Sequence, residues 1–296
     1  MEASLSSLEN VLVIVLSSGE NETEECIKSI NMQAGVDFSL YRIIDRPNKE
    51  AHEKLYRKIE EETARFDVFV KVDADMIFVS RNTLAGMVDY FRKSEVDHAV
   101  FSVLDWYSQT AIMGMHVFSN RCTWPDLNDP LFVDPSPSSP GESILVWDKP
   151  SPVAYHSPNP SISQAVQFGF HRGLKITQRK RDNISISRAL FHYNLIKQVY
   201  NQYMLSRDSR LRAALYGAER AIRSRESVLV SRNDGFIEKI IDEYLRVETE
   251  PLDRKFVSRW GVNRYGTNAL FQKTFFPIVI RYWLLSLKRK LIGKCL

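Results

Sequence analysis

The amino-acid sequence predicts an α/β fold, in which helices flank a mostly parallel sheet and a helical C-terminal extension follows. In the first half of the chain, short apolar runs alternate with amphipathic helical patterns, which is the sequence form of βαβ units. Beyond Ser161 the apolar residues recur only at helical spacing. We therefore expect two parts, a sheet-containing domain over residues 1–176 and a helical region over residues 177–296.

The sheet-containing domain is expected to begin with a buried strand and a short helix. Val11–Leu16 is a continuous apolar run, typical of a strand that is covered on both faces. After a polar turn, Asn21 and Glu24 have the spacing of a capping box at the start of a helix. The same alternation predicts further strands at 39–44, 99–104 and 112–118, a strand ending at residue 73, and helices at 49–65 and 83–93.

The later elements differ from the first ones in composition. Between Trp124 and Pro160 the chain is rich in Pro, Ser and Asp, which predicts an irregular segment of the kind that often forms an active-site loop. After it, apolar periodicity predicts helices at 161–174, 184–204, 210–223 and 235–246.

Composition bounds the class of protein. The chain has 296 residues, 44% of them hydrophobic, enough to bury a sizeable core. A net charge of +4 fits an anionic substrate or membrane surface, and no zinc-finger or helix-turn-helix signature indicates a nucleic-acid partner. The three cysteines, Cys26, Cys122 and Cys295, are widely spaced, so neither a disulfide framework nor a zinc site is predicted. With a polar N-terminus that lacks the pattern of a secretory signal, we expect a cytoplasmic protein.

The most informative motif is Asp73-Ala74-Asp75, at the end of a β-prone run. In extended backbone side chains alternate, so the two carboxylates would point the same way and could clamp a hard divalent cation, Mn²⁺ or Mg²⁺. Two other interpretations remain. One is a solvated strand end; the other is the nucleophile motif of a haloacid-dehalogenase-type phosphotransferase, although the motif lies some seventy residues into the chain with no downstream Gly-Asp pair.

The start of the chain combines three motifs in a fixed order. The apolar strand 11–16 is followed by Ser17-Ser18-Gly19-Glu20 and then by a helix of the form Cys-Ile-x-Ser-Ile-x-x-Gln over residues 26–33, with the Asp-x-Asp about forty residues later. In this order the motifs resemble those of family 2 glycosyltransferases. The similarity is good over 11–118, weaker to Leu174 and absent beyond it.

The resemblance implies a GT-A fold that binds a nucleoside-diphosphate sugar together with Mn²⁺ or Mg²⁺. Asp73 would contact donor and metal, and Asp75 would hold the metal. Ser17 and Glu20 would line the nucleotide pocket. Asp45 matches the acid that contacts the base in many relatives, although the turn here has the sequence Asp45-Arg46-Pro47-Asn48 and not Asp-Asp-Gly-Ser.

Two more residues are assigned through the same resemblance. His156 would reach the metal or the diphosphate, with a loop histidine bonded to backbone as the alternative. Gly114, in Met113-Gly114-Met115, would let a strand pass under the donor sugar, with a β-bulge as the alternative. His171 and His116 are expected to be structural.

A catalytic base is harder to assign from the sequence. The segment 124–134 lies where relatives carry a Glu-Asp pair, which this chain lacks. Among its acids we select Asp129 and Asp134 as candidates to take the proton of an acceptor hydroxyl. A retaining mechanism without such a base remains open.

Residues 270–296 mix aromatic, aliphatic and basic side chains, and their apolar run is too short to span a bilayer. Such a mixture favours a helix lying on an anionic membrane surface, at the inner face of the membrane, with a packed C-terminal helix as the alternative. Taken together, the sequence predicts a metal-dependent glycosyltransferase that moves a sugar from a nucleoside-diphosphate sugar to a glycan or lipid-linked acceptor, in surface polysaccharide assembly. The alternative is a non-catalytic nucleotide- or glycan-binding scaffold.

Overall fold

The computed structural model describes residues 11–126, 128–129, 131–224, 235–260 and 277–285. Its internal contacts divide the chain into two compact units, residues 1–160 and 161–296. The boundary therefore lies before the helix that begins at Ile162, whereas the sequence analysis placed it at 176/177. That helix packs mainly on another helix of the second unit, which explains the earlier boundary.

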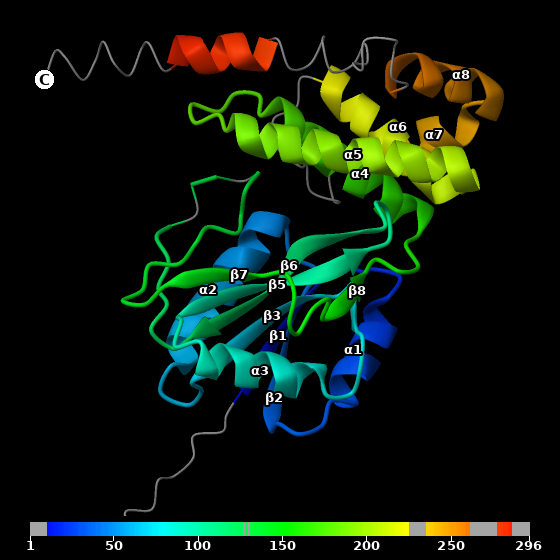
Figure 1. Ribbon diagram of the computed structural model, residues 1–296. Helices are drawn as coiled ribbons and strands as arrows, with labels where there is room; N and C mark the ends of the chain where they lie inside the picture. The colour runs from blue at the N-terminus through cyan, green and yellow to red at the C-terminus, as the bar shows by residue number, and fades with distance from the viewer. Residues whose placement is uncertain (1–10, 127, 130, 225–234, 261–276, 286–296) are drawn as a thin grey trace, which may run out of the picture. The chain divides into compact units, whose positions relative to one another are not determined.

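The first unit is built around one sheet (Figure 1). It contains, in order, β1 (Val11–Ser17), α1 (Thr23–Asn31), β2 (Phe38–Ile44), α2 (Asn48–Glu62), β3 (Val68–Asp73), β4 (Met76–Phe78), α3 (Thr83–Lys93), β5 (His98–Asp105), β6 (Thr110–Ser119), β7 (Ser143–Val146) and β8 (Ala154–His156). The predicted strands and the predicted helix at 83–93 are confirmed, while the helix predicted at 49–65 ends at Glu62.

The sheet is mixed, with both parallel and antiparallel strand pairs, whereas a mostly parallel sheet was expected. Its strand order is β2-β1-β3-β6-β5-β8-β4, with β7 also paired to β5. β6 runs antiparallel to both β3 and β5, and β4 runs antiparallel to β8. The cause is the β5–β6 hairpin, which returns β6 into the space between β3 and β5.

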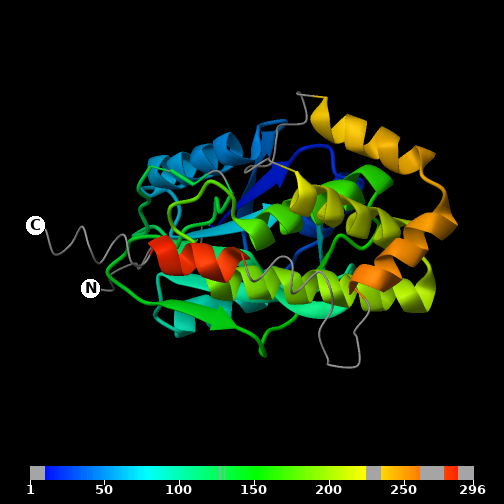
Figure 2. The ribbon, with the colours of Figure 1, turned by 90° about the horizontal axis from the view of Figure 1, so that it is seen from above.

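The two faces of the sheet are covered by different helices. Leu12 and Phe69 belong to a core cluster that also contains Leu55 and Ile59 of α2. On the other face, Tyr90 of α3 packs edge-on against Phe101. Figures 1 and 2 accordingly show α2 and α3 on opposite sides of the sheet.

Strand direction determines where polar residues gather. β1, β2 and β3 are parallel, and β5 has the same direction because two antiparallel pairings separate it from β3. β8 is parallel to β5. The carboxyl ends of these five strands therefore meet at one edge, which carries Ser17, Asp73, Asp105 and His156, and open α/β sheets bind ligands at that edge.

The second unit is helical. It contains α4 (Ile162–Thr177), α5 (Ile186–Ser206), α6 (Ser209–Arg223), α7 (Phe236–Arg246) and α8 (Thr249–Trp260), and residues 277–285 are helical too. The four helices predicted for this part of the sequence are confirmed, and α8 is additional. Among the described residues, no helix is both long and apolar enough to cross a bilayer.

Two local features of these helices follow from single residues. The capping box expected at Asn21 is wrong, because α1 begins after Glu22 without a side-chain cap; a capping box instead starts α4, between Ser161 and Gln164. Helices α4 and α6 also approach very closely. A methyl group on Gly169 would lie 1.7 Å from the carbonyl oxygen of Ala214, so only glycine fits there.

Candidate functional site

The two carboxylates of the Asp73-Ala74-Asp75 motif are placed in different surroundings. β3 ends at Asp73, and Ala74 and Asp75 form a turn that leads into β4. The expectation that extended backbone aligns both side chains is therefore wrong. Asp73 instead faces Lys71 of its own strand, while Asp75 faces the end of β8.

Asp75 belongs to a group that we call the histidine cluster: Asp75, Asp105, His156 and Ser157. The Ser157 hydroxyl donates to Asp75 Oδ2 at 2.6 Å, and the Ser157 backbone N–H donates to the Asp75 carbonyl at 2.7 Å. His156 Nε2 lies 3.4 Å from Asp75 Oδ2. The proximity of His156 to Asp75, expected from the sequence, is thus present in the structure.

Asp105 orients the imidazole ring of His156. Its Oδ1 lies 2.7 Å from His156 Nδ1, while its Oδ2 accepts from the backbone N–H and the hydroxyl of Ser108. A carboxylate only accepts, so Nδ1 carries the hydrogen, and Nε2 is the atom turned toward Asp75. Histidines that bind metals are commonly held in this way, by a carboxylate on the other ring nitrogen.

Asp75 is poorly compensated in this setting. Burial raises its pKa above the ordinary range, with the negative charge of Asp73 acting in the same direction and His156 and Ser157 opposing it. Its Oδ1 is buried and has no hydrogen-bond partner among the residues that the structure describes. An acceptor left without a partner is costly, and a proton or a cation would remove the cost.

Asp73 belongs to a second group, the lysine cluster: His52, Tyr56, Lys71, Asp73 and Asp134. Lys71 is 3% exposed, and its ammonium nitrogen lies 3.0 Å from Asp134 Oδ1 and 3.4 Å from Asp73 Oδ1. Burial alone would lower the pKa of Lys71, but these two carboxylates outweigh it and raise the pKa. The lysine therefore stays charged and pairs with both acids.

Two residues of α2 complete the lysine cluster around Asp134. The Tyr56 hydroxyl donates to Asp134 Oδ1 at 3.3 Å, and His52 Nε2 lies 3.1 Å from the same oxygen. Burial of Asp134 favours its neutral form, but Lys71, His52 and His116 together outweigh burial and hold the pKa of this carboxyl well below its usual range. Asp134 is thus an ionised, multiply bonded carboxylate.

The donor atoms fit a divalent cation only if a ligand supplies further oxygens. Among the residues that the structure describes, no three His, Cys, Asp or Glu side chains are grouped as a metal site. Asp75 and His156 offer two adjacent donors, and the buried Oδ1 of Asp75 can accept a cation. Mg²⁺ typically binds in this way, through one or two carboxylates and the phosphate oxygens of a substrate.

Other residues selected from the sequence lie at the same edge with local contacts. The Glu20 carboxylate accepts from the backbone N–H and the hydroxyl of Ser18, so it closes its own turn. Ser17 is buried at the end of β1, where its carbonyl accepts from the N–H of Asp45 at 2.9 Å. Asp45 itself is exposed and adopts a left-handed backbone, with φ 51°.

The positions of Asp129 and Gly114 are explained by the backbone around them. Asp129 Oδ1 accepts from the N–H groups of Leu131 and Phe132, which stabilises the loop. Gly114 lies at a register shift between β5 and β6, and a Cβ there would lie 2.8 Å from Val103. This geometry favours the β-bulge alternative for Gly114. His116 stacks on His98 within the sheet, as expected for a structural residue.

Asp105, Lys71 and Ser157 were not predicted from the sequence to belong to the site. Asp105 directly follows a predicted strand and lies at the same edge as Asp73, so its position in the sequence could have indicated a site residue. Lys71 interrupts an apolar run, and only the folded structure shows that Asp134, 63 residues later, pairs with it.

No protein-family model and no curated protein sequence matches the chain. Among solved structures, the chain is similar to the mannosyltransferase PcManGT from Pyrobaculum calidifontis, determined in complex with GDP-Man and Mn²⁺. The identity is 13%, the TM-score is 0.35, and the alignment covers 91% of this chain and 86% of that chain.

Proposed function

We propose that this protein is a metal-dependent glycosyltransferase that uses a nucleoside-diphosphate sugar. One observation carries the proposal: at the carboxyl edge of the sheet, the Asp75 carboxylate and His156 Nε2 face each other at 3.4 Å. Beside them is a buried carboxylate oxygen for which the described part of the chain supplies no partner. Two acceptors in this arrangement are stabilised by a cation between or beside them. A diphosphate would complete the coordination of that cation.

The residues of the edge then divide the work. Asp75 and His156 would hold the cation, which when bound neutralises the charge of the departing diphosphate. Asp105 keeps His156 Nε2 directed toward Asp75, and Ser157 fixes the Asp75 carboxylate. Ser17 and Asp45 lie at the ends of β1 and β2, where a nucleoside would be bound.

A binding screen with the full chain tests this proposal. We expect nucleoside diphosphates to raise the melting temperature in the presence of Mn²⁺ and to do so much less with EDTA. The preferred nucleotide then identifies the donor sugar to be used in a hydrolysis and transfer assay. If no nucleotide shifts the melting temperature with or without Mn²⁺, the proposed function is wrong.

The lysine cluster supports a second candidate, a non-catalytic scaffold that binds a nucleotide. Both acids selected as catalytic bases are already bonded, Asp134 to Lys71 and Asp129 to backbone N–H groups. A scaffold would bind Mn²⁺ and nucleotide without hydrolysing any donor, whereas a retaining enzyme would turn over without using either acid as a base. Donor hydrolysis with Mn²⁺ separates the two candidates.

An anionic membrane surface is proposed as the place of action. The helix over 277–285 exposes Trp283 and Leu284, at 63% and 62%, and Lys288, Arg289 and Lys290 follow it in sequence. The rest of the predicted segment 270–296 lies outside the described residues. Within the second unit, Arg281 donates to the carbonyls of Gln178 and Arg181, so part of this helix is packed.

Vesicle binding tests this location. The full chain should sediment with anionic vesicles at low salt, and substitution of Trp283 and Leu284 by serine should weaken binding without altering the circular dichroism spectrum. Deletion of residues 277–296 should remove vesicle binding while transfer to a soluble acceptor analogue is kept. Equal recovery with neutral and anionic vesicles, or none with either, would contradict the proposal.

A further inference from the structure

Helix α1 and the turn after it present polar side chains that the proposed function does not use. Cys26 and Ser29 are three residues apart on one face of α1, and Gln33 lies just beyond Asn31, the last residue of the helix. Each of them bonds the chain that follows the Asp75 turn. We call these three residues the α1 seam.

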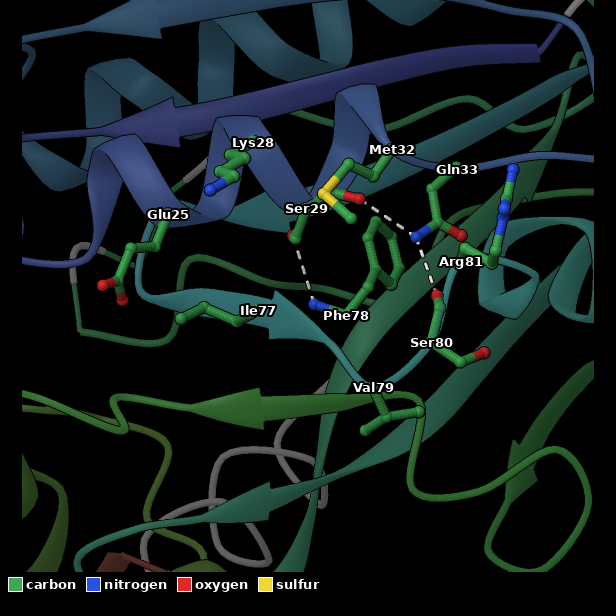
Figure 3. Close-up of a pocket in the computed structure, with 10 residues that line it drawn as sticks. All are labelled: Glu25, Lys28, Ser29, Met32, Gln33, Ile77, Phe78, Val79, Ser80 and Arg81. Atoms are coloured by element: carbon green, nitrogen blue, oxygen red, sulfur yellow. Dashed lines mark hydrogen bonds between the residues drawn. The ribbon is translucent and has the colours of Figure 1, made fainter.

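Ser29 seals the open edge of the sheet. β4 is the last strand in the strand order, and β8 is its one strand neighbour in the described sheet. The N–H of Phe78 donates to the Ser29 hydroxyl at 3.2 Å, and this hydroxyl donates to the carbonyl of Cys26 at 2.8 Å (Figure 3 draws the Ser29–Phe78 bond). A backbone donor at a sheet edge is thus satisfied by a helix side chain.

Gln33 bonds three more backbone groups. Its side-chain N–H group donates to the carbonyls of Ser29 and Ser80, at 3.0 and 2.8 Å, as Figure 3 shows. Its carbonyl oxygen accepts from the N–H of Leu84 in the first turn of α3, at 2.8 Å. One amide group therefore joins the end of α1, the chain after β4 and the start of α3.

Cys26 contacts both ends of the turn that carries Asp75. Its thiol lies 3.9 Å from the carbonyl oxygen of Asp73, and the N–H of Met76 donates to its sulfur. Burial, together with the negative charges of Asp75, Asp73 and Glu20, raises the pKa of Cys26 to about 12. The sulfur remains a neutral thiol that packs under the turn.

The three residues contact successive parts of the chain after Asp73: Cys26 contacts the turn, Ser29 contacts β4, and Gln33 contacts the start of α3. On the opposite side, Ser157 and His156 contact Asp75. We propose that the α1 seam positions Asp75 against His156, so that Ser29 and Gln33 are positioning residues for the cation and diphosphate. This inference rests on the proposed function for its ligand, while its structural part concerns the protein alone.

A Ser29→Ala variant is expected to fold. A cavity of about 350 Å³, lined by Ser29 and Phe78 among other residues, adjoins the lost bond (Figure 3). Water in this cavity can solvate the freed N–H of Phe78, which keeps the loss of stability to about 1 kcal/mol. Ser29→Thr retains a hydroxyl and serves as the conservative variant. Gln33→Met removes all three hydrogen bonds of the Gln33 side chain at nearly constant side-chain volume.

Ser119→Ala provides a matched control. The Ser119 hydroxyl is buried, donates to Asp97 at 2.6 Å and accepts from the N–H of Arg121 at 3.2 Å, so it loses a similar pair of bonds. Ser119 pairs with Val68, at the beginning of β3 and thus at the end of the sheet opposite Asp75.

Two measurements decide the inference. Hydrogen exchange of the protein without ligand should be faster over residues 74–84 in Ser29→Ala and Gln33→Met, but not in Ser119→Ala. The Mn²⁺ concentration needed for half-maximal nucleoside-diphosphate binding should rise about tenfold or more in the two seam variants, a size usual for partners that orient metal ligands. It should stay unchanged in Ser119→Ala and return toward the wild-type value in Ser29→Thr.

The outcomes are distinguishable. If hydrogen exchange becomes faster by the same amount across the whole first unit in all variants, the α1 seam does not hold the Asp75 turn. Local exchange without a change in Mn²⁺ dependence would overturn its positioning role. If the wild-type chain binds no nucleotide, the proposed function fails and with it the positioning role, while the exchange data still decide whether the seam holds the turn.

Discussion

The lysine cluster and the histidine cluster contain the two carboxylates of one short motif, yet they are stabilised in opposite ways. In the lysine cluster, Lys71 neutralises Asp73 and Asp134, and the pKa of Asp134 is lowered. In the histidine cluster, the pKa of Asp75 is raised, and one of its oxygens has no partner within the described ranges of the chain. The first cluster therefore contributes to the stability of the folded chain, whereas the second is the one that we propose binds a cation.

The largest expected effect is on the lysine cluster. Lys71→Met keeps the length of the side chain but leaves two carboxylates without a counter-charge. Because Asp73 and Asp134 are 37% and 38% exposed, we expect the free energy of unfolding to fall by about 3 kcal/mol, the lower end of the range for a broken buried pair. Urea unfolding measures this loss.

A double-mutant cycle provides the control for Lys71→Met. Adding Asp134→Asn should restore part of the lost stability, because it removes one of the two uncompensated charges. Additive effects of the two substitutions would contradict the ion pair as the source of the stability.

The second prediction compares the two acids of the motif directly. Asp75→Asn should leave the free energy of unfolding nearly unchanged and weaken Mn²⁺-dependent nucleotide binding about a hundredfold, or about 2.7 kcal/mol. Asp73→Asn should weaken it less, since Asp73 is already paired with Lys71. Isothermal titration with Mn²⁺ and nucleoside diphosphate measures both variants, and equal losses would remove the distinction between the clusters.

The effect of acid is the smallest of the three when it is counted per histidine and per pH unit. Burial lowers the pKa of His98 to about 4 and that of His116 to about 3. Between pH 6.5 and 4 the unfolded chain therefore binds more protons than the folded one. The free energy of unfolding decreases as the pH is lowered, by about 1 kcal/mol per pH unit for each histidine. The lowered pKa of Asp134 reduces stability only below about pH 4, where this carboxyl becomes protonated in the unfolded chain.

A His98→Gln variant isolates this contribution. Its free energy of unfolding, measured in urea at several pH values between 7 and 4.5, should depend less steeply on pH than that of the wild type. Asp75, whose raised pKa acts with the opposite sign, is present in both proteins and cancels in the difference. Parallel pH profiles would show that His98 is protonated as readily in the folded chain as in the unfolded one.

Much of this arrangement could be predicted from the sequence, for reasons that particular residues make clear. The apolar run at 11–16 and the amphipathic run at 83–93 have strong periodicity, and both form the predicted elements. His156 lies near Asp75 because the ends of parallel strands share an edge. β4 and β8, with three residues each, are too short to show any periodicity.

The remaining differences depend on contacts between distant segments. In the sequence, Lys71 only interrupts the apolar pattern of its strand. Its pairing with Asp134 depends on the position that a long irregular segment takes in the folded chain. The mixed direction of the sheet could not be derived either, because the position of β6 between β3 and β5 is decided by packing and not by its own residues. The length of a strand does not determine which strands lie beside it.

The pairing of β4 with β8 also determines when the site can form. The Ser157 hydroxyl that holds Asp75 comes from 82 residues further along the chain, and Asp105 and His156 are 51 residues apart. A chain leaving the ribosome therefore carries Asp75 without these partners until residue 157 has been made. Contacts of such long range are slow to form, so the histidine cluster is assembled late in folding, after β1, β2 and β3 can already pair.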